Sequence, residues 1–397
     1  MKKIVIVSGV FVPEPVTTAL MNYDLALALS KKYDVTVIRP KPTRPVGKDY
    51  GIVDYNHYPF KCIQLDSFTY PESRIIGRMR ESISFGKSCA AYIKAHKTDI
   101  DVVYNASWQL FGYKIVSKCC KKCGIPYVMP IQDIYPECLF TGKHYPKIIE
   151  EIAKSILSPL DLYSQKNAFK IRTISNEMAD YMAETRKIPR ENYLVIDNWQ
   201  NDEDFSYNPL DEMKEKIVFG YVGSINDHSN TELIIQAFNE AKLPNSELRI
   251  YGAGNHKDAC VALAKKLDAT NVTFDVVDKK QVPYVQAETD VLVMALPTNN
   301  GGLCLPSKMI SYLLSGRAVL ASIEESATTR YMEEADCGLA VKPDSIPALV
   351  VGFTYFAQLS RNELQRLGKN SRVFAEKKLT RNSNLPLVIA ALEDAMK

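Results

Sequence analysis

The feature that most constrains the fold is a succession of short apolar runs rich in β-branched residues, most of them separated by segments with helical periodicity. The runs of the first half are 4–8, 35–39, 102–106, 127–131, 171–175 and 194–197. Those of the second half are 217–223, 248–252, 272–277, 291–296, 318–322 and 338–342. Runs that are apolar throughout are typical of parallel strands buried on both faces. Their alternation with helices predicts an α/β chain with two Rossmann-like, doubly wound parallel-sheet domains.

A polar and acidic segment separates the two sets of runs. We expect residues 1–198 to form an N-terminal domain, 199–216 to be a hinge or linker, and 217–379 to form a C-terminal domain. The remaining residues, 380–397, are expected to form one more helix that packs back towards the N-terminal domain. A chain of 397 residues is long enough for two domains.

Composition excludes several classes of protein. Hydrophobic residues make up 46% of the chain and charged residues 24%, as in ordinary globular proteins. No apolar run approaches the ~20 residues that span a bilayer. The nine cysteines are an odd number with no secreted framework, which favours a cytoplasmic location. Neither they nor the five histidines show a complete zinc-ligand pattern, so we predict no metal and no cofactor.

Charge is distributed unevenly between the two halves. Residues 1–200 hold 28 Lys and Arg against 20 Asp and Glu, a balance of +8, and the remainder holds 21 against 26, a balance of −5. The first half can therefore face an anionic surface or a phosphorylated substrate, but it is not basic enough to indicate nucleic acid. Within it, 70–89 surrounds an apolar helical stripe with arginines. Such a helix can rest on an anionic bilayer or pack on its own domain, and both alternatives stay open.

A Gly-rich loop after the run at 291–296 is the sharpest candidate for a ligand site. Gly301 and Gly302 precede a helix for which Ser307 is the expected N-cap and Gly316 the expected C-terminal glycine. Backbone N–H groups at such a helix start bind anions. Lys308 in the first turn costs about 0.3–1 kcal/mol unless an anion lies beside it. We therefore predict a diphosphate there, the alternative being a lysine that merely extends into water.

Ligands of parallel sheets gather at the carboxyl ends of the strands, so the loops after the other runs also matter. The loop 220–230 joins a strand to a helix through Gly223 and carries His228, the one histidine that we expect near a ligand. The stretch 250–259 has Gly252 and Gly254, but Lys257 replaces the third glycine of a dinucleotide fingerprint. Contact with a nucleobase or ribose is therefore expected there rather than NAD binding.

Carboxylates mark two loops of the first half. Glu14 lies between two prolines, in a loop that forms either a wall of a cleft or a simple crossing over the sheet. Asp133 and Glu137 follow the run at 127–131. Such side chains can bind sugar hydroxyls or accept a proton, and the alternative is that one of them caps a helix near Pro136.

These motifs, in this order, resemble the family 4 glycosyltransferases of the GT-B fold, and in particular the branch that acts in bacterial O-antigen, capsule and colanic-acid synthesis. The resemblance covers nearly the whole chain. The sharpest segments are DIYPE (133–137), VIDNWQNDEDF (195–205), IYGAGNHKDA (250–259) and LPSKMISYLLSGRAVLA (305–321), and the initial PEP (13–15) with the following LALALSKKYDVTVI (25–38) is also typical.

The resemblance implies a retaining transferase with two domains facing across a cleft, the C-terminal one for the donor and the N-terminal one for the acceptor. The implied donor is a nucleotide-diphosphate sugar, UDP-linked, that gives a hexosyl or N-acetylaminosugar group. The implied acceptor is a hydroxyl of a glycan or of a polyprenyl-diphosphate-linked oligosaccharide in surface polysaccharide synthesis. Asp133 and Lys308 would be catalytic. The residues implied near the diphosphate are Gly223, Ser224, Asn300, Gly301, Gly302, Leu303, Ser307 and Lys308. Those implied near the nucleoside are Gly252, Gly254 and Val277, and those near the sugar or acceptor are Glu14, Glu137 and His228.

The sequence also departs from that family at positions where many members carry charged groups. Leu303 and Ser311 stand in place of two glutamates, and Ser224 and Ser229 in place of a phosphate-clamping Arg and Lys. These departures favour one alternative, a degenerate, non-catalytic subunit that binds glycan or lipid. A second alternative is a non-hydrolysing nucleotide-sugar 2-epimerase. Peripheral contact with the inner face of the plasma membrane is compatible with the predicted cytoplasmic location.

Overall fold

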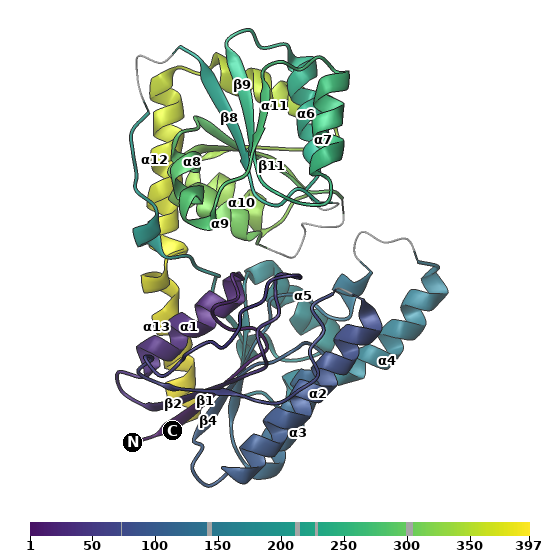
Figure 1. Ribbon diagram of the computed structural model, residues 1–397, viewed down its shortest axis with the longest axis vertical. Helices are drawn as coiled ribbons and strands as arrows, with labels where there is room; N and C mark the ends of the chain where they lie inside the picture. The colour runs from purple at the N-terminus through teal and green to yellow at the C-terminus, as the bar shows by residue number, and fades with distance from the viewer. Residues whose placement is uncertain (73, 141–144, 211–214, 227–228, 299–304) are drawn as a thin grey trace. The chain divides into compact units, whose positions relative to one another are not determined.

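The chain is described by a computed structural model that covers residues 1–397 except 73, 141–144, 211–214, 227–228 and 299–304. It consists of two compact units (Figure 1). Residues Met1–Asp197 and Asn384–Lys397 form the first unit, and Asn198–Ser383 form the second. Each unit contains one parallel sheet with helices on both faces.

The first unit has a seven-stranded sheet in the order β3-β2-β1-β4-β5-β6-β7, with every neighbouring pair parallel. Its strands are β1 (Lys3–Ser8), β2 (Asp34–Arg39), β3 (Lys61–Gln64), β4 (Val102–Ala106), β5 (Tyr127–Pro130), β6 (Lys170–Thr173) and β7 (Tyr193–Val195). Its helices are α1 (Thr17–Leu29), α2 (Ile75–Ala95), α3 (Phe111–Cys123), α4 (Lys147–Lys166) and α5 (Asn176–Arg186), with short 3-10 turns η1 (Glu137–Leu139) and η2 (Arg190–Asn192). Helix α3 packs between α2 and α4.

The second unit has a six-stranded parallel sheet in the order β10-β9-β8-β11-β12-β13. Its strands are β8 (Ile217–Val222), β9 (Ser246–Tyr251), β10 (Val272–Asp275), β11 (Val291–Ala295), β12 (Ala318–Ser322) and β13 (Gly338–Val341). Its helices are α6 (Thr231–Ala241), α7 (Lys257–Lys266), α8 (Val282–Ala287), α9 (Ser307–Leu314), α10 (Ala327–Ala335), α11 (Ile346–Gln358) and α12 (Arg361–Lys378), with η3 (Asp202–Asp204) and η4 (Lys279–Gln281). The last helix, α13 (Arg381–Ala395), begins in this unit and continues into the first.

The predicted pair of parallel sheets is confirmed, and each expected run is a strand whose ends lie within two residues of those predicted. The runs were recognisable because central strands such as β4 and β11 are buried at every residue. The sequence analysis missed one strand, β3. It lies at the sheet edge, where Lys61 and Gln64 are exposed, so it lacks a continuous apolar run.

The segment predicted as a hinge, 199–216, joins the second unit in its described part. Phe205 is buried in a core cluster of that unit, and its carbonyl accepts a hydrogen bond of 2.8 Å from Arg372. The prediction of a linker rested on the acidic residues around Phe205, and the sequence did not show that this aromatic side chain is buried. At the other end of the chain, Glu393 accepts hydrogen bonds from Lys32 (2.8 Å) and Tyr33 (2.6 Å), which hold α13 beside the end of α1. No helix in the described part of the chain combines the length and the apolar character that a membrane span requires.

A buried arginine fixes the loop after β5. Arg186, at the end of α5, donates to Asp161 of α4 at 2.9 Å and to both carboxylate oxygens of Glu137 at 2.7 and 2.8 Å. It also donates to the Tyr135 carbonyl at 2.8 Å. Burial acts to raise the pKa of Glu137, but the hydrogen bonds and charge of Arg186 outweigh it and hold that pKa below its usual value. At Asp161 burial dominates and raises the pKa. One guanidinium thus ties together two helices and the loop.

We predict that Arg186→Met lowers the free energy of unfolding of the first unit by about 3–5 kcal/mol, because it leaves a buried carboxylate without its partner. The matched control is Arg190→Met, which removes hydrogen bonds to Asp180, Asn176 and the Tyr193 carbonyl, in a pair whose Arg190 and Asp180 side chains are 40% and 67% exposed. It should cost about 1 kcal/mol or less. Urea denaturation of both variants tests this, and equal losses would contradict the assigned role of Arg186.

Candidate functional site

The loops after β8, β9 and β10 run side by side at the carboxyl edge of the second sheet. The amide of Gly223 donates to the Tyr251 carbonyl, that of Ile225 to the Ala253 carbonyl, and that of Gly252 to the Asp275 carbonyl, each at 2.9 Å. The strand ladder therefore continues into the loops. It brings together Gly223 and Gly252, which the sequence analysis placed in separate motifs.

Two glycines permit this close approach of backbones. A Cβ on Gly252 would lie 1.9 Å from the carbonyl oxygen of Gly223, and one on Gly254 would lie 1.9 Å from that of Ile225. Gly254 also has a φ of +154°, which side chains disfavour. The spacing that resembles a dinucleotide fingerprint thus serves the packing of neighbouring loops, and it leaves backbone at the surface where a ligand can approach.

Lys308 lies over this ladder. It projects from the first turn of α9, its Nζ donates to the hydroxyl of Tyr221, and it lies 4.2 Å from the centre of that ring. The Tyr221 hydroxyl in turn donates to the Ser224 carbonyl at 2.6 Å. Beneath the lysine is Gly223, with a φ of +154°, where a Cβ would lie 2.3 Å from Lys308 Cε. Tyr221 and Gly223 therefore set the position of the ammonium group.

The charge of Lys308 has no counter-charge among the described residues, because no carboxylate there forms an ion pair with it. Burial lowers the pKa of Lys308 to about 8. A partly buried cation without an anionic partner is costly, and a bound anion would remove that cost. This is the chemistry of an anion site, next to exposed loop backbone.

The remaining residues predicted near the donor differ in their exposure and in their place in the fold. Ser224 and Ser307 are exposed, and Val277 packs against the core cluster that contains Met309. Ser307 is not the N-cap that we expected: Pro306 holds that position in an extended conformation, and Ser307 is the first helical residue. The expected glycine at the helix end is confirmed, since Gly316 has a φ of +65°. The predicted residues Asn300, Gly301, Gly302, Leu303 and His228 lie outside the described residues.

Ser311, which stands where many relatives of the predicted family carry a glutamate, is buried in α9. Its hydroxyl accepts a hydrogen bond of 3.1 Å from Gln286 and donates one of 2.8 Å to the Lys308 carbonyl. The position therefore belongs to the packing of α9 on α8 and adds no charge to the site.

At the carboxyl edge of the first sheet, Asp133 follows β5 with an exposed side chain. No described residue donates a hydrogen bond to its carboxylate. Beside it in the sheet order, Trp108 follows β4, and the guanidinium groups of Arg44 and Arg78 lie 4.3 and 5.6 Å from its ring. The indole N–H of Trp108 is buried and has no partner in the described part of the chain. An unpaired carboxylate and an aromatic ring at one edge suit the binding of a polar ring compound.

The sequence analysis missed Trp108, Arg44 and Tyr221. Trp108 had a usable signal, since it is one of two tryptophans and comes directly after a predicted strand end. Arg44 had none, because its position over Trp108 depends on a long loop. Tyr221 was taken as part of an apolar strand, and only the tertiary structure shows its hydroxyl at Lys308.

Glu14 and Glu137 are both engaged by the protein. Glu14 is 2% exposed and accepts hydrogen bonds from the amides of Phe11, Thr43 and Arg44 at 3.3, 3.0 and 2.9 Å. Glu137 is held by Arg186. These partners give both carboxylates a part in holding loops together, and their contact with a sugar or acceptor stays a prediction.

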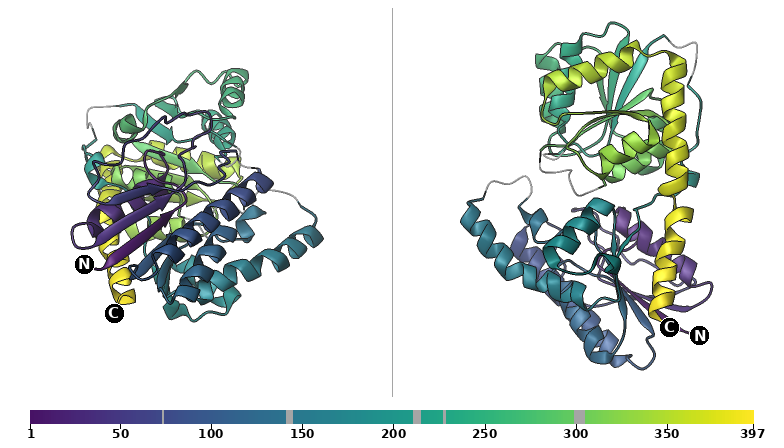
Figure 2. Two further views of the ribbon diagram at one scale, coloured as in Figure 1. Left: turned by 60° about the horizontal axis from the view of Figure 1, so that its bottom comes forward. Right: turned by 180° about the vertical axis from the view of Figure 1, so that it is seen from behind.

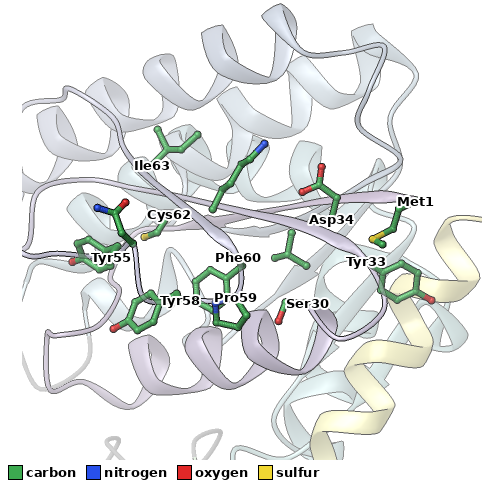
Figure 3. A pocket seen from close by; sticks show the side chains of 13 residues that line it. Met1, Ser30, Tyr33, Asp34, Tyr55, Tyr58, Pro59, Phe60, Cys62 and Ile63 are labelled. Carbon is green, nitrogen blue, oxygen red and sulfur yellow. The ribbon is translucent and has the colours of Figure 1, made fainter.

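A separate recess of about 730 Å³ lies at the amino ends of β2 and β3 in the first unit (Figure 3). Tyr55, Tyr58 and Phe60 line it together with Asp34 and other residues. It lies at the opposite edge of the sheet from Asp133 and Trp108, because Asp34 begins its strand. It is therefore not part of the candidate site.

Comparisons with known proteins agree with this architecture. The model of Glycosyltransferase Family 4 matches residues 19–203, and that of Glycosyl transferases group 1 matches residues 202–374. No curated protein sequence matches the chain.

Solved structures match over the full length. Sucrose-phosphate synthase from Thermosynechococcus elongatus has a TM-score of 0.75 at 15% identity, covering 99% of each chain. A glycosyltransferase from Rickettsia africae has a TM-score of 0.70 at 14% identity, covering 100% of this chain and 99% of its own. HepE from Anabaena, in complex with UDP and glucose, has a TM-score of 0.70 at 13% identity, covering 99% and 100%. At these identities the likeness shows a shared fold.

The two family models adjoin near residue 202 and together account for residues 19–374, in the order that the motifs predicted. The more specific assignment to O-antigen, capsule or colanic-acid synthesis stays a prediction. The chain belongs to the family 4 glycosyltransferases and has their GT-B fold.

Proposed function

We propose that the protein is a retaining glycosyltransferase that transfers a hexosyl or N-acetylaminosugar group from a UDP-linked donor. The proposed acceptor is a hydroxyl of a glycan or lipid-linked oligosaccharide in surface polysaccharide synthesis. The second unit binds the donor and the first the acceptor. The observation that carries the proposal is the ammonium group of Lys308, held over Gly223 without a carboxylate partner among the described residues.

In the proposed reaction the bond between the anomeric carbon and the leaving phosphate breaks, and a bond to the acceptor oxygen forms on the same face of the sugar. The acceptor proton passes to an oxygen of the leaving diphosphate, so no protein base is required. Negative charge grows on that diphosphate as its bond breaks. A positioned ammonium group and backbone amides stabilise such charge more than the ground state and so lower the barrier.

Asp133 and Trp108 are the proposed acceptor-side groups. The exposed carboxylate of Asp133 can accept hydrogen bonds from sugar hydroxyls and stabilise positive charge on the reacting sugar. The indole of Trp108, whose N–H lacks a partner among the described residues, offers a ring edge for a second sugar contact. The presence of UDP and glucose in the HepE structure supports the choice of a UDP-linked donor.

One structural feature favours a second candidate, a non-catalytic partner subunit: Ser311 stands buried in place of an acidic residue. A thermal-shift screen over nucleoside diphosphates and their sugars, followed by incubation of the best donor without acceptor, separates the alternatives. Release of free sugar and UDP supports a transferase, and a new epimer of the donor indicates an epimerase. Absence of any nucleotide binding indicates the partner subunit.

We predict that Lys308→Ala lowers transfer, or donor hydrolysis where the acceptor is unknown, about 100-fold or more, because the developing charge loses its cation. The control is Lys265→Ala, which removes an exposed lysine of α7 in the same unit. Both variants should keep the melting temperature within a few degrees. Near-normal turnover by Lys308→Ala would refute the assignment.

We predict that UDP affinity falls as pH rises above about 8. The pKa of Lys308 in the free protein is about 8, so the ammonium is present below that pH and is lost above it. A bound diphosphate raises this pKa, and the affinity therefore drops about tenfold per pH unit between the two values. Calorimetry from pH 7 to 9 measures the slope. Lys308→Arg keeps its charge and should show no such slope, and an equal slope in both proteins would assign the titration elsewhere.

We predict that Gly223→Ala weakens UDP binding about tenfold or more, because a methyl group there displaces Lys308 and strains the backbone. In a Lys308→Ala background the same substitution should cost less, since the displaced group is gone and only the backbone strain remains. A double-mutant cycle by calorimetry measures this coupling. Additive losses would show that Gly223 acts without Lys308.

A further inference from the structure

Asp344 lies between β13 and α11, and its carboxylate binds groups from two other loops of the second unit. One oxygen accepts hydrogen bonds from the backbone amide of Thr298 at 2.8 Å and from the hydroxyl of the same residue at 2.6 Å. The other oxygen accepts a hydrogen bond of 2.8 Å from the side-chain amide of Asn230. No Lys or Arg in the described part of the chain forms an ion pair with this carboxylate. Neutral donors from two loops therefore hold it.

The backbone around Asp344 fixes the direction of its side chain. Asp344 has a φ of +51°, a conformation that Asp adopts more readily than most residues. The next residue, Ser345, is the N-cap of α11 and accepts a hydrogen bond of 3.3 Å from the Ala348 amide. Burial acts to raise the pKa of Asp344, but the hydrogen bonds from Thr298 and Asn230 outweigh it and hold that pKa below its usual value. The carboxylate is thus charged at neutral pH and is a strong acceptor.

The two loops that Asp344 joins lead to helices on opposite faces of the second sheet. Asn230 immediately precedes α6, which packs beside α11 (Figures 1 and 2). Thr298 follows β11 on the segment that leads to α9. Helices α6 and α11 share one core cluster and α9 belongs to the other, and alternate residues of β11 contribute to the two clusters. Asp344 is therefore a link between the two layers at the carboxyl edge of the sheet.

The loop before α6 also holds the groups that position Lys308. Ser229 and Thr231 flank Asn230, are buried, and have hydroxyl oxygens 2.8 Å apart. Burial raises the pKa of Tyr221 to about 12, and hydrogen bonding to the hydroxyls of Thr231 and Ser229 acts against that rise. Tyr221 in turn accepts the hydrogen bond of Lys308. A continuous series of contacts therefore runs from the start of α6 to the ammonium group.

We propose that Asp344 is a positioning residue for the donor site. By binding both loops at once, it keeps the ammonium group of Lys308 at the hydroxyl of Tyr221. A protein that already has the binding arrangement when free binds its ligand more tightly than one that must first adopt it. The proposal rests on the proposed function, because it takes Lys308 to be the group that binds the donor diphosphate.

UDP calorimetry on the full chain tests the proposal. We expect Asp344→Ala to weaken UDP binding about tenfold, and Asp344→Asn, which keeps an acceptor oxygen for Thr298, to weaken it less. The matched control is Asp336→Ala. Asp336 is another exposed aspartate of this unit with a positive φ, +47°, and its carboxylate accepts hydrogen bonds from Arg366 and Asn370. This control should keep the UDP affinity of the wild type, even where both Ala variants melt at a lower temperature.

The same measurement can contradict the proposal in three ways. Unchanged UDP affinity in Asp344→Ala would overturn it. An equal loss in Asp344→Ala and Asp336→Ala would also overturn it, because general destabilisation would then explain the effect. Tighter binding by Asp344→Asn would do so as well, since the charge of Asp344 would then act by repelling the diphosphate.

Coupling between the three residues gives a second readout. Thr298→Val removes the hydroxyl donor, and Asn230→Gly removes the side-chain amide while leaving a residue that tolerates the φ of +46°. Each substitution should weaken UDP binding about threefold by itself, and neither should weaken it further in the Asp344→Ala background. Full additivity would show that the two loops act without Asp344 and would refute its role.

Amide hydrogen exchange of the free protein separates this proposal from the proposed function. The amide of Thr298 donates to Asp344, so Asp344→Ala should speed its exchange and Asp336→Ala should not. A protein that shows this difference but binds no UDP would keep the link between the loops and remove the proposed function. Equal exchange in wild type and Asp344→Ala would remove the link itself.

Discussion

The second unit is organised around a positive charge without a negative partner among its described residues. Lys308 is held between the Tyr221 ring and Gly223, and its pKa falls to about 8 as a result of burial. A bound anion would remove the cost of keeping this cation partly buried. The ladder of loops after β8 and β9 fixes the backbone at Tyr221 and Gly223, on which the position of Lys308 depends.

In the first unit, by contrast, the described carboxylates near the carboxyl edge of the sheet are mostly paired with other protein groups. Three of its carboxylates have partners within the protein: Glu14 accepts three backbone amides, and Glu137 and Asp161 share Arg186. These contacts fix the loops at the carboxyl edge of the sheet. Two groups without described partners lie at this edge: the Asp133 carboxylate, on the loop that Arg186 fixes, and the Trp108 indole N–H, whose ring lies beside Arg44. A rigid frame around a few unsatisfied polar groups is typical of a binding site.

The outer surfaces of the same unit show why a pattern alone cannot identify a partner. The spacing of isoleucines on α4 is that of an ordinary amphipathic helix, and such a stripe is normally covered by the protein's own core. Only the tertiary structure shows that the isoleucines of α4 are exposed, because it shows that no described neighbouring helix covers them. The basic stretch on α2 was recognisable in the sequence, since four cations surround it, although whether it packed inward or faced solvent was open.

Local chemistry in the sequence was sufficient to determine the two parallel sheets, the helix end at Gly316 and the presence of an unusual lysine in the first turn of α9. Those features depend on residues close together in the chain: continuous apolar runs, a glycine with positive φ, and a cation at the wrong end of a helix dipole. The tertiary structure alone decided which charges are paired. The pairs Glu137–Arg186 and Lys308–Tyr221 join residues about 50 and 90 positions apart, so folding brings them together and sequence spacing does not reveal them.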